Sequence, residues 1–340
     1  MLRVGWSAVA AVVAGFVLGA SVAARDSILS ADFYQGKTLR IVTGSSLGGG
    51  FDVEARLLAR HIVRHLPGAP RVAVENKPGA GGLLAANLVA RGSAPDGLTL
   101  GYFTLALPMA QLARNPAVQF DARQFEFIGA PYEDPALCTF SRSSGIVTFE
   151  QWRRSPRALR LGSTGPDSMT AVMPAVLLAA FGLPMRVITG YKGTPEIRLA
   201  MISGEIDGTC LNMGGTNNAW PTRSGVTVVV RSGRSDLDPK APLAMSLAST
   251  PRQRELIGVI DMLALVSRTY AFPPGTPTDR RDVVRRAFEA TMRDPVYVAE
   301  ARTASIVVEP LTGDAVAAAV GRVLSVPPSL AAALAPPPAR

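Results

Sequence analysis

The sequence predicts a two-lobed α/β protein, in which each lobe is a doubly wound sheet and a cleft separates the two lobes. Short β-branched runs alternate with segments whose apolar residues recur at helical spacing, a pattern typical of doubly wound sheets. The same plan of strand, Gly/Ser-rich loop and helix occurs twice along the chain. With 340 residues, 48% of them hydrophobic and 18% charged, the chain is long enough for two globular domains.

The first lobe is predicted from three β-branched runs and two helical segments. We expect strands at residues 38–43, 71–75 and 98–104, and helices at residues 52–66 and 83–91. Glycine-rich loops at residues 44–50 and 78–82 separate strand from helix each time. Short connections of this kind favour a parallel sheet.

The second lobe repeats the alternation. We expect strands at residues 136–141, 158–163, 186–188, 206–211 and 226–230, with helices starting at 148–153 and spanning 168–181. A proline-rich turn at 272–277 precedes an amphipathic helix at 279–292, which returns the chain to the first lobe. The predicted domains are therefore lobe 1 at 25–131, lobe 2 at 132–255, a return to lobe 1 at 256–326, and a flexible Pro/Ala-rich tail at 327–340.

The N-terminal residues 1–24 resemble a secretory signal peptide. Arg3 precedes an apolar run at 4–18, and Ser21-Val22-Ala23 forms a small-x-small cleavage pattern, so we expect cleavage near Ala23 or Ala24 and a periplasmic location. An uncleaved membrane anchor is the alternative, since the run approaches the length of a spanning helix. No later segment has eighteen consecutive apolar residues, which predicts a soluble mature protein.

The basic composition does not indicate a nucleic-acid partner. The net charge is +9, and only four of the 35 basic residues are lysines, which leaves 31 arginines. The arginines are scattered in ones and twos, without the aromatic-interleaved basic run that stacks bases and neutralises phosphates. We therefore expect no nucleic acid, and a positive field that helps attract small anions.

Cys138 and Cys210 are the two cysteines of this chain. An exported protein reaches a compartment that permits disulfides, so the two can pair. Two buried free thiols are the alternative, because the sequence does not give the distance between the two Cα atoms.

The loop at residues 45–52 (SSLGGGFD) is the richest local feature. A glycine-rich turn that opens a helix leaves backbone N–H groups pointing beyond the helix N-terminus, where the helix dipole favours an anion. A second loop, at residues 162–168 (GSTGPDS), lies between a strand and a helix in the second lobe. If both loops face the cleft, they can hold a carboxylate without a buried lysine or arginine. The alternative is an ordinary strand-to-helix turn that Asp52 caps.

Three other interpretations of the motifs are weaker. Residues 44–48 (GSSLG) match the serine-hydrolase nucleophile elbow with Ser46 as nucleophile, but the histidines, His61 and His65, lie in the next helix rather than late in the chain. The same histidines are four residues apart, yet Ile62 stands where a metalloprotease helix has glutamate. The glycines at 78–82 lack the third glycine and the lysine of nucleotide-binding loops. We therefore expect that the protein is not an enzyme and that it binds no metal ion and no cofactor.

Several segments together resemble one family, the periplasmic solute receptors of tripartite tricarboxylate transporters, often called Bug-type receptors. The matching segments, in order, are residues 37–52, 74–82 (VENKPGAGG), 94–100 (APDGLTL), 190–194 (GYKGT), 204–208 (GEIDG) and 273–277 (PPGTP). The match covers nearly all of the chain beyond residue 25. Each motif is modest alone, but their order and spacing make coincidence improbable.

The resemblance implies a Venus-flytrap receptor of the periplasmic-binding-protein type, a monomer that binds a small carboxylate and delivers it to membrane permease subunits. A ligand-sensing partner of a membrane signalling protein is the alternative within the binding class. The family resemblance and the two loops together imply a set of ligand-binding residues. These are Ser45, Ser46, Gly48, Gly49, Gly50, Phe51, Asp52, Ala80, Gly81, Ser163, Thr164, Gly165, Ser168, Tyr191 and Asn212.

This chain departs from the family pattern at two positions. Phe51 stands where the family usually has Thr or Ser, which implies an apolar portion of the ligand at that point. Leu211 stands where many members have Asp before Asn212, which argues against a ligand with an amino group there. Cys138 and Cys210 occur together in one branch of the family, and this resemblance favours a disulfide.

Overall fold

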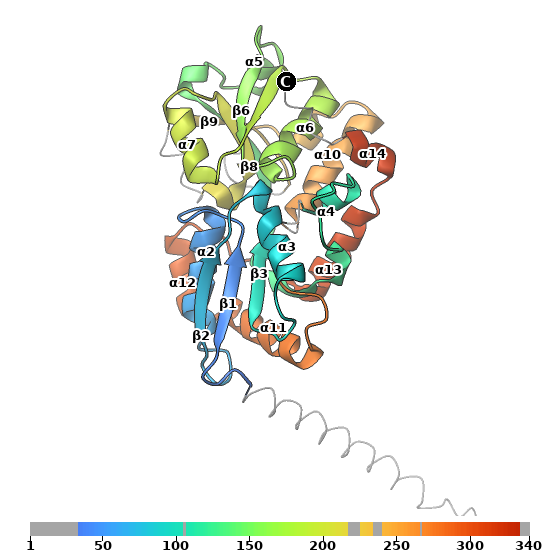
Figure 1. Ribbon diagram of the computed structural model, residues 1–340. Helices are drawn as coiled ribbons and strands as arrows, with labels where there is room; N and C mark the ends of the chain where they lie inside the picture. Colours follow the sequence, from blue (N-terminus) through green and yellow to red (C-terminus); the bar gives the residue numbers. More distant parts are fainter. Residues whose placement is uncertain (1–32, 105–106, 217–224, 234–239, 266, 334–340) are drawn as a thin grey trace, which may run out of the picture.

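The computed structural model describes residues 33–104, 107–216, 225–233, 240–265 and 267–333. Two lobes lie one above the other, each with a β-sheet flanked by helices (Figure 1). This arrangement confirms the predicted α/β class with two lobes. The predicted signal segment lies outside the described residues. No helix in the described part of the chain is long and apolar enough to cross a membrane.

Lobe 1 is built on a six-stranded sheet in the order β11-β4-β10-β3-β1-β2. Its strands are β1 (Thr38–Thr43), β2 (Arg71–Asn76), β3 (Thr99–Phe103), β4 (Glu126–Ala130), β10 (Thr269–Phe272) and β11 (Leu311–Thr312). Its helices are α2 (Gly50–Ile62), η1 (Ala80–Gly82), α3 (Leu83–Arg91), α4 (Leu107–Leu112), η2 (Ala122–Gln124), α11 (Thr278–Arg293), α12 (Pro295–Thr303) and α13 (Gly313–Leu324).

Lobe 2 is built on a five-stranded sheet in the order β7-β6-β8-β5-β9. Its strands are β5 (Ala136–Ser141), β6 (Leu159–Ser163), β7 (Met185–Thr189), β8 (Gly208–Asn212) and β9 (Val226–Arg231). Its helices are η3 (Arg142–Ser144), α5 (Phe149–Arg153), α6 (Met169–Phe181), α7 (Thr194–Ile202), η4 (Met213–Thr216), α9 (Ala244–Leu247) and α10 (Pro251–Ala264).

The sheets are mixed, so the expectation of parallel sheets is correct only in part. Strand β1 pairs in parallel with β2 and β3, and β6 pairs in parallel with β7 and β8. Strands β4, β10 and β11 pair with their neighbours antiparallel, and so does β5 with β8 and β9. Two of the antiparallel strands, β5 and β10, are the first strands after a crossing between the lobes, so each enters its sheet from the opposite end.

The chain crosses from lobe 1 to lobe 2 at residues 131–135 and returns between the end of α10 and the start of β10. The predicted return at residue 256 is wrong, because that position lies inside α10, whose apolar face packs against α6 in the core of lobe 2. The predicted tail also needs correction: it begins with a helix, α14 (Pro328–Ala333), and Leu330 joins the same core. Residues 334–340 lie outside the described part.

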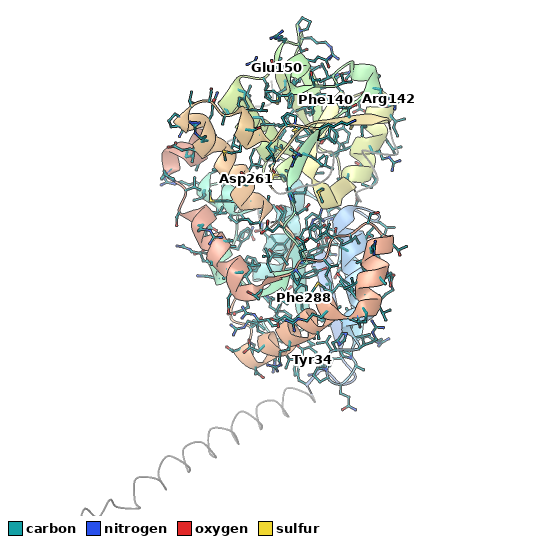
Figure 2. The ribbon with its side chains drawn as sticks, turned by 180° about the vertical axis from the view of Figure 1, so that it is seen from behind. Tyr34, Phe140, Arg142, Glu150, Asp261 and Phe288 are labelled. Atoms are coloured by element: carbon teal, nitrogen blue, oxygen red, sulfur yellow. A yellow bond between two sulfur atoms is a disulfide. The ribbon has the colours of Figure 1, made fainter. Side chains whose placement is uncertain are left out.

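Each lobe has its own apolar core. Phe288 packs in lobe 1 and Phe140 in lobe 2, well separated along the molecule (Figure 2). In lobe 2 the Trp152 ring packs against Phe140 and is fully buried. The end of α13 and α14 also connect the lobes, since Val323 and Leu330 pack in the lobe 2 core. Separate cores joined by a few connecting segments are the architecture that lets rigid lobes move about a hinge.

Cys138 of β5 and Cys210 of β8 form a disulfide. The two residues lie directly opposite each other in the antiparallel pair, and their Cα atoms are 3.9 Å apart. The structure therefore has the pairing that the family resemblance favours, and the disulfide joins two central strands of lobe 2.

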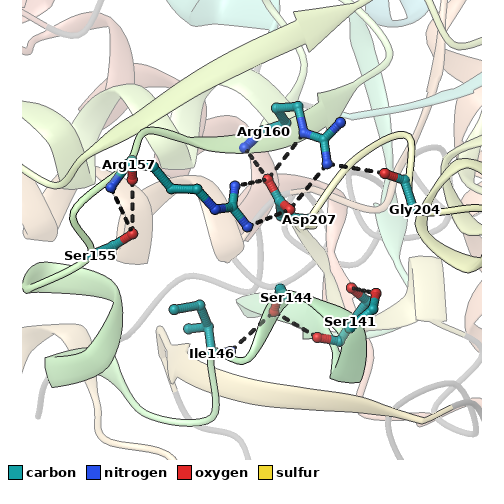
Figure 3. Close-up of polar contacts among 9 residues, drawn as sticks. Ser141, Ser144, Ile146, Ser155, Arg157, Arg160, Gly204 and Asp207 are labelled. Atoms are coloured by element: carbon teal, nitrogen blue, oxygen red, sulfur yellow. Dashed lines mark hydrogen bonds and ion pairs between the residues drawn. The ribbon is translucent and has the colours of Figure 1, made fainter.

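Asp207, in the motif at residues 204–208, lies at the end of the lobe 2 sheet away from lobe 1. Its buried carboxylate accepts two hydrogen bonds from Arg157, both 2.9 Å, and one of 2.8 Å from the Arg160 backbone N–H (Figure 3). Burial acts to raise the pKa of Asp207, but the bonds from Arg157 and Arg160 outweigh it and hold the pKa well below its usual range. This motif therefore serves the fold of lobe 2.

We expect Asp207→Asn to lower the free energy of unfolding by about 2 kcal/mol at pH 7, since one partner of a charge-assisted cluster is removed. A carboxyl group with a lowered folded-state pKa stabilises the fold above its unfolded pKa and loses this contribution as the pH falls. The deficit should thus shrink below about pH 4. Urea denaturation across this pH range checks it, with Glu150→Gln, in an exposed ion pair on α5, as the control. A deficit that is constant with pH would contradict the assignment.

Candidate functional site

A cleft lies between the two lobes, where the parallel strands of both sheets end. Its volume is about 720 Å³ including the open mouth. Lobe 1 lines it with residues at or just after the ends of β1, β2 and β3, and lobe 2 lines it with residues at or just after the ends of β6, β7 and β8. Ligands of open α/β sheets bind outside the carboxyl ends of strands, so this is the position expected of a binding site.

The lobe 1 wall is the N-terminus of α2. Gly50 and Phe51, the first two residues of the helix, line the cleft. The first N–H groups of a helix have no intrahelical partner, and α2 has no side-chain cap. Its N-terminus therefore offers free donors and the positive end of a helix dipole.

Asp52 holds this loop in shape. Its carboxylate accepts hydrogen bonds of 2.9 Å from the Gly48 N–H, the Arg56 side chain and the Asn76 side chain. Asn76 also donates to the Ser45 carbonyl, 3.0 Å. Burial acts to raise the pKa of Asp52, but these hydrogen bonds outweigh it and the pKa is lowered. Asp52 was predicted to contact ligand; the structure instead places its carboxylate within the loop, because these donors occupy it.

The lobe 2 wall is the N-terminus of α6. Thr164, Ser168, Met169 and Thr170 line the cleft there. The Ser168 hydroxyl donates to the Gly165 carbonyl, 2.8 Å, and the Thr164 N–H donates to the Thr170 hydroxyl, 3.0 Å. The side chains are therefore occupied in shaping the loop, and the backbone N–H groups of Met169 and Thr170, the first two residues of α6, are left for a ligand.

A third helix N-terminus, that of α7, also reaches the cleft. Lys192, Gly193 and Thr194 line it. The prediction named Tyr191 in this segment, but its hydroxyl donates to the Glu205 carboxylate at the surface. The sequence does carry a signal for the start of α7, because Pro195 stands in the first turn of the helix, where proline is favoured.

The lobes touch at positions where a side chain would not fit. A methyl group added at Gly165 would lie 2.6 Å from the Gly81 backbone N, and one added at Gly193 would overlap the Ser46 hydroxyl. The Asn115 side-chain amide donates to the Asp167 carboxylate, 2.5 Å, from lobe 1 to lobe 2. The loop at 162–168 therefore meets the loop at 78–82, and the loop at 45–52 meets the segment at 190–194, so lobe-to-lobe contacts are made on both sides of the cleft.

The inner part of the cleft is apolar with one buried cation. Aromatic and aliphatic side chains from Phe51, Tyr102, Phe103 and Leu211 line it, as do Asn212 and Arg268. The Asn212 side-chain amide donates to the Asp134 carbonyl, 2.7 Å. Arg268 is fully buried, and no sequence pattern predicted its role.

The predicted site residues divide into two groups. Those that line the cleft are Ser45, Gly50, Phe51, Gly81, Thr164, Ser168 and Asn212. Those that lie outside its lining are Ser46, Gly48, Gly49, Asp52, Ala80, Ser163, Gly165 and Tyr191. Most of the second group shape the loops. The Ser163 hydroxyl, for example, is buried and donates to the Gly165 carbonyl, 3.0 Å.

His61 of α2 and His65 in the turn after it face α12 and its N-terminal capping residue rather than Ser46. The His61 ring bonds to the Glu300 carboxylate, and the His65 ring to the Asp294 carboxylate, 2.9 Å. Ser46 lies instead beside Gly193 of lobe 2. The serine-hydrolase interpretation thus lacks its histidine partner. Among the described residues no group of three His, Cys, Asp or Glu side chains is placed to hold a metal ion.

Two α/β lobes that meet over a cleft walled by helix N-termini define a solute-binding protein of the periplasmic-binding-protein class. The family model described as "Tripartite tricarboxylate transporter family receptor" (TctC) matches residues 55–318, more than three quarters of the chain. The chain belongs to this family, which confirms the resemblance in its motifs.

Two curated relatives share part of the chain. A Cupriavidus necator protein described as "UPF0065 protein in gbd 5'region" is 30% identical over 190 residues, 54% of this chain and 56% of that protein. BugT of Bordetella pertussis is 38% identical over 111 residues, 32% of each chain. The chain thus spans about half the length of the first relative and a third of the second.

Solved structures share the fold at low sequence identity. The periplasmic binding protein BugD has a TM-score of 0.72 at 22% identity, over 88% of this chain and 96% of that one. MatC of Rhodopseudomonas palustris with bound malate has a TM-score of 0.71 at 21% identity, over 87% and 99%. An R. palustris protein with adipate has a TM-score of 0.67 at 17% identity, over 88% and 97%.

Proposed function

We propose that this protein is a periplasmic solute receptor that closes its lobes around a small carboxylate and delivers it to a tripartite tricarboxylate-type membrane transporter. The observation that carries the proposal is the position of two long helices, α2 and α6, one per lobe, whose N-termini line the same cleft. Family membership supports the transporter as partner.

The carboxylate is held by backbone rather than by a salt bridge. The N–H groups of Gly50 and Phe51 from lobe 1 and of Met169 and Thr170 from lobe 2 belong to first helical turns that line the cleft. Two helix dipoles of the same sense favour a negative charge between them. Lys192, exposed at the cleft, adds long-range attraction for an anion.

Closure follows from contacts made with both lobes at once. A ligand that touches α2 alone binds the open and closed states equally, whereas a ligand that also touches α6 stabilises the closed state. The hinge lies in the crossing at 131–135 and in the crossing between α10 and β10. The permease then recognises the closed receptor, which acts as a monomer, and no bond of the ligand is made or broken.

The chemistry of two related structures supports a carboxylate. MatC carries malate and the other R. palustris protein carries adipate, and both share this fold. In this chain the glycine-rich loops supply the donors that such a group requires.

A thermal-shift screen of the purified receptor against a panel of mono-, di- and tricarboxylates tests the proposal. At a hundredfold excess over its dissociation constant, a true ligand adds about 2.7 kcal/mol to the stability of the folded state. The matched amides and alcohols, which lack the carboxylate, serve as controls and should give no shift. A panel in which no acid raises Tm, or in which the amides raise it equally, would contradict the proposal.

A further inference from the structure

Arg268 occupies the back of the cleft, at the second crossing between the lobes. It lies between α10 and β10, its side chain is fully buried, and it lines the cleft together with Phe51 and Leu211. Its guanidinium carbon is 3.9 Å from the centre of the Phe51 ring. Burying an arginine among apolar groups costs free energy unless each of its N–H donors has a hydrogen-bond acceptor. The acceptor of each guanidinium nitrogen therefore has to be identified.

Two of the three guanidinium nitrogens have partners. Nε donates to the Asp134 carboxylate in the first crossing, and Nη1 to the Glu54 carboxylate of α2, 3.3 Å. Glu54 also accepts hydrogen bonds from the Tyr102 and Tyr132 hydroxyls, the latter 2.7 Å. These bonds fix the position of the guanidinium relative to the α2 N-terminus.

The third nitrogen, Nη2, is buried and has no acceptor among the described residues. A methyl group added at Gly214 would overlap the Tyr132 hydroxyl and lie 2.6 Å from Nη2, so the space that these two groups share exists because that residue is glycine. A charged N–H group without an acceptor is rare in a folded interior. In a wall of the binding cleft, the natural acceptor is an atom of the ligand.

The charge around Arg268 limits what this acceptor is. The carboxyl groups of Glu54 and Asp134 already share the one guanidinium. A ligand carboxylate at Nη2 would be a third acidic group at a single buried cation, and like charges repel strongly where the dielectric constant is low. A hydroxyl or carbonyl oxygen accepts the hydrogen bond without that cost.

We propose, on the basis of the receptor function above, that Arg268 Nη2 donates a hydrogen bond to an uncharged oxygen of the ligand and so determines specificity. The receptor then selects monocarboxylates with an apolar body and a hydroxyl or carbonyl oxygen, over di- and tricarboxylates. The apolar body packs against Phe51, Tyr102 and Leu211, and the carboxylate binds at the helix N-termini.

Isothermal titration of the full receptor with two matched series tests this inference. The aliphatic series is hexanoate, 6-hydroxyhexanoate and adipate, and the aromatic series is benzoate, 4-hydroxybenzoate and terephthalate. In at least one series the hydroxy acid should bind about tenfold or more tighter than both other members, which is the factor expected of one charge-assisted hydrogen bond.

Tighter binding of adipate or terephthalate would overturn the inference and leave the receptor function intact. If no acid in either series binds, the inference is wrong, and the wider panel decides the function separately.

Arg268→Lys should remove the preference for the hydroxy acid, because lysine keeps the charge but cannot reach three acceptors in the guanidinium geometry. Lys192→Gln is the control, since it removes the other cation of the cleft lining and should weaken all members of a series by one common factor. If Arg268→Lys does not fold, Gly214→Ala provides the second variant, because its methyl group displaces both Nη2 and the neighbouring Tyr132 hydroxyl and leaves the charge in place. A folded variant of either kind that keeps the full preference would contradict the role of Nη2.

Discussion

Arg268→Met is expected to lower the free energy of unfolding by about 3–5 kcal/mol at pH 7, because it leaves the buried Glu54 and Asp134 carboxylates without their cation. The two carboxylates come from α2 and from the first crossing, and Arg268 itself belongs to the second crossing. One guanidinium therefore joins both hinge segments to the helix that opens the ligand site. Urea denaturation of the ligand-free protein gives the value.

The pH dependence of this loss has a defined sign. Burial raises the pKa of Glu54 and of Asp134, and the Arg268 charge opposes that rise. Without Arg268 both folded-state pKa values rise further. A carboxyl group with a raised folded-state pKa costs stability as the pH increases through that value. The deficit of the variant should therefore be smaller at pH 5 than at pH 8.

Arg123→Met is the matched control for Arg268→Met. Arg123 forms an exposed ion pair with Asp121, and such pairs contribute about 0–1 kcal/mol. If both substitutions cost the same, or if the Arg268 deficit does not change with pH, the Glu54–Arg268–Asp134 cluster does not stabilise the fold in the way described here.

Gly165→Val is expected to weaken ligand binding by up to about a hundredfold, since it blocks closure. The added side chain would meet the backbone of Gly81 and Ala80, which cannot rotate away as a side chain can. Overpacking of this kind penalises the closed state by up to about 3 kcal/mol, and affinity falls with the closed population. Titration with the tightest acid of the panel measures the loss, and small-angle scattering shows whether the variant stays open with ligand present.

Gly165→Ala and Gly258→Ala complete this comparison. The smaller methyl group at Gly165 should give an intermediate loss of affinity. Gly258 lies in α10 with nothing within 4 Å of an added Cβ, so its substitution should leave affinity unchanged. A Gly165→Val variant that binds as tightly as the unmodified protein would mean that the lobes do not meet at this loop when ligand is bound.

The fold was predictable from sequence where local pattern determines it. The helix expected at 83–91 and the strand at 136–141 have those bounds in the structure, because turn-forming residues mark their starts locally: Gly82 precedes the helix and Pro135 precedes the strand. Strands β4, β10 and β11 were missed. They are short and lie antiparallel beside strands from distant parts of the chain, so their pairing depends on tertiary contacts rather than on local propensity.

The site was predictable to the extent that it consists of loops. The loops around Ser45 and Ser168 do line one cleft. Which atoms of a loop face the ligand was not predictable, as Asp52 and Ser163 illustrate, because their polar groups turn inward to bond the loop. Arg268 could not be found at all, since its partners are 134 and 214 residues away in the sequence.

A crystal structure of the receptor with the tightest carboxylate of the panel tests the central claim most directly. The account predicts that the carboxylate oxygens lie within 3.2 Å, the usual limit of an N–H···O bond, of backbone nitrogens in the first turns of both α2 and α6. A carboxylate bound to one lobe alone, or held chiefly by the side chain of Lys192 or Arg268, would contradict it.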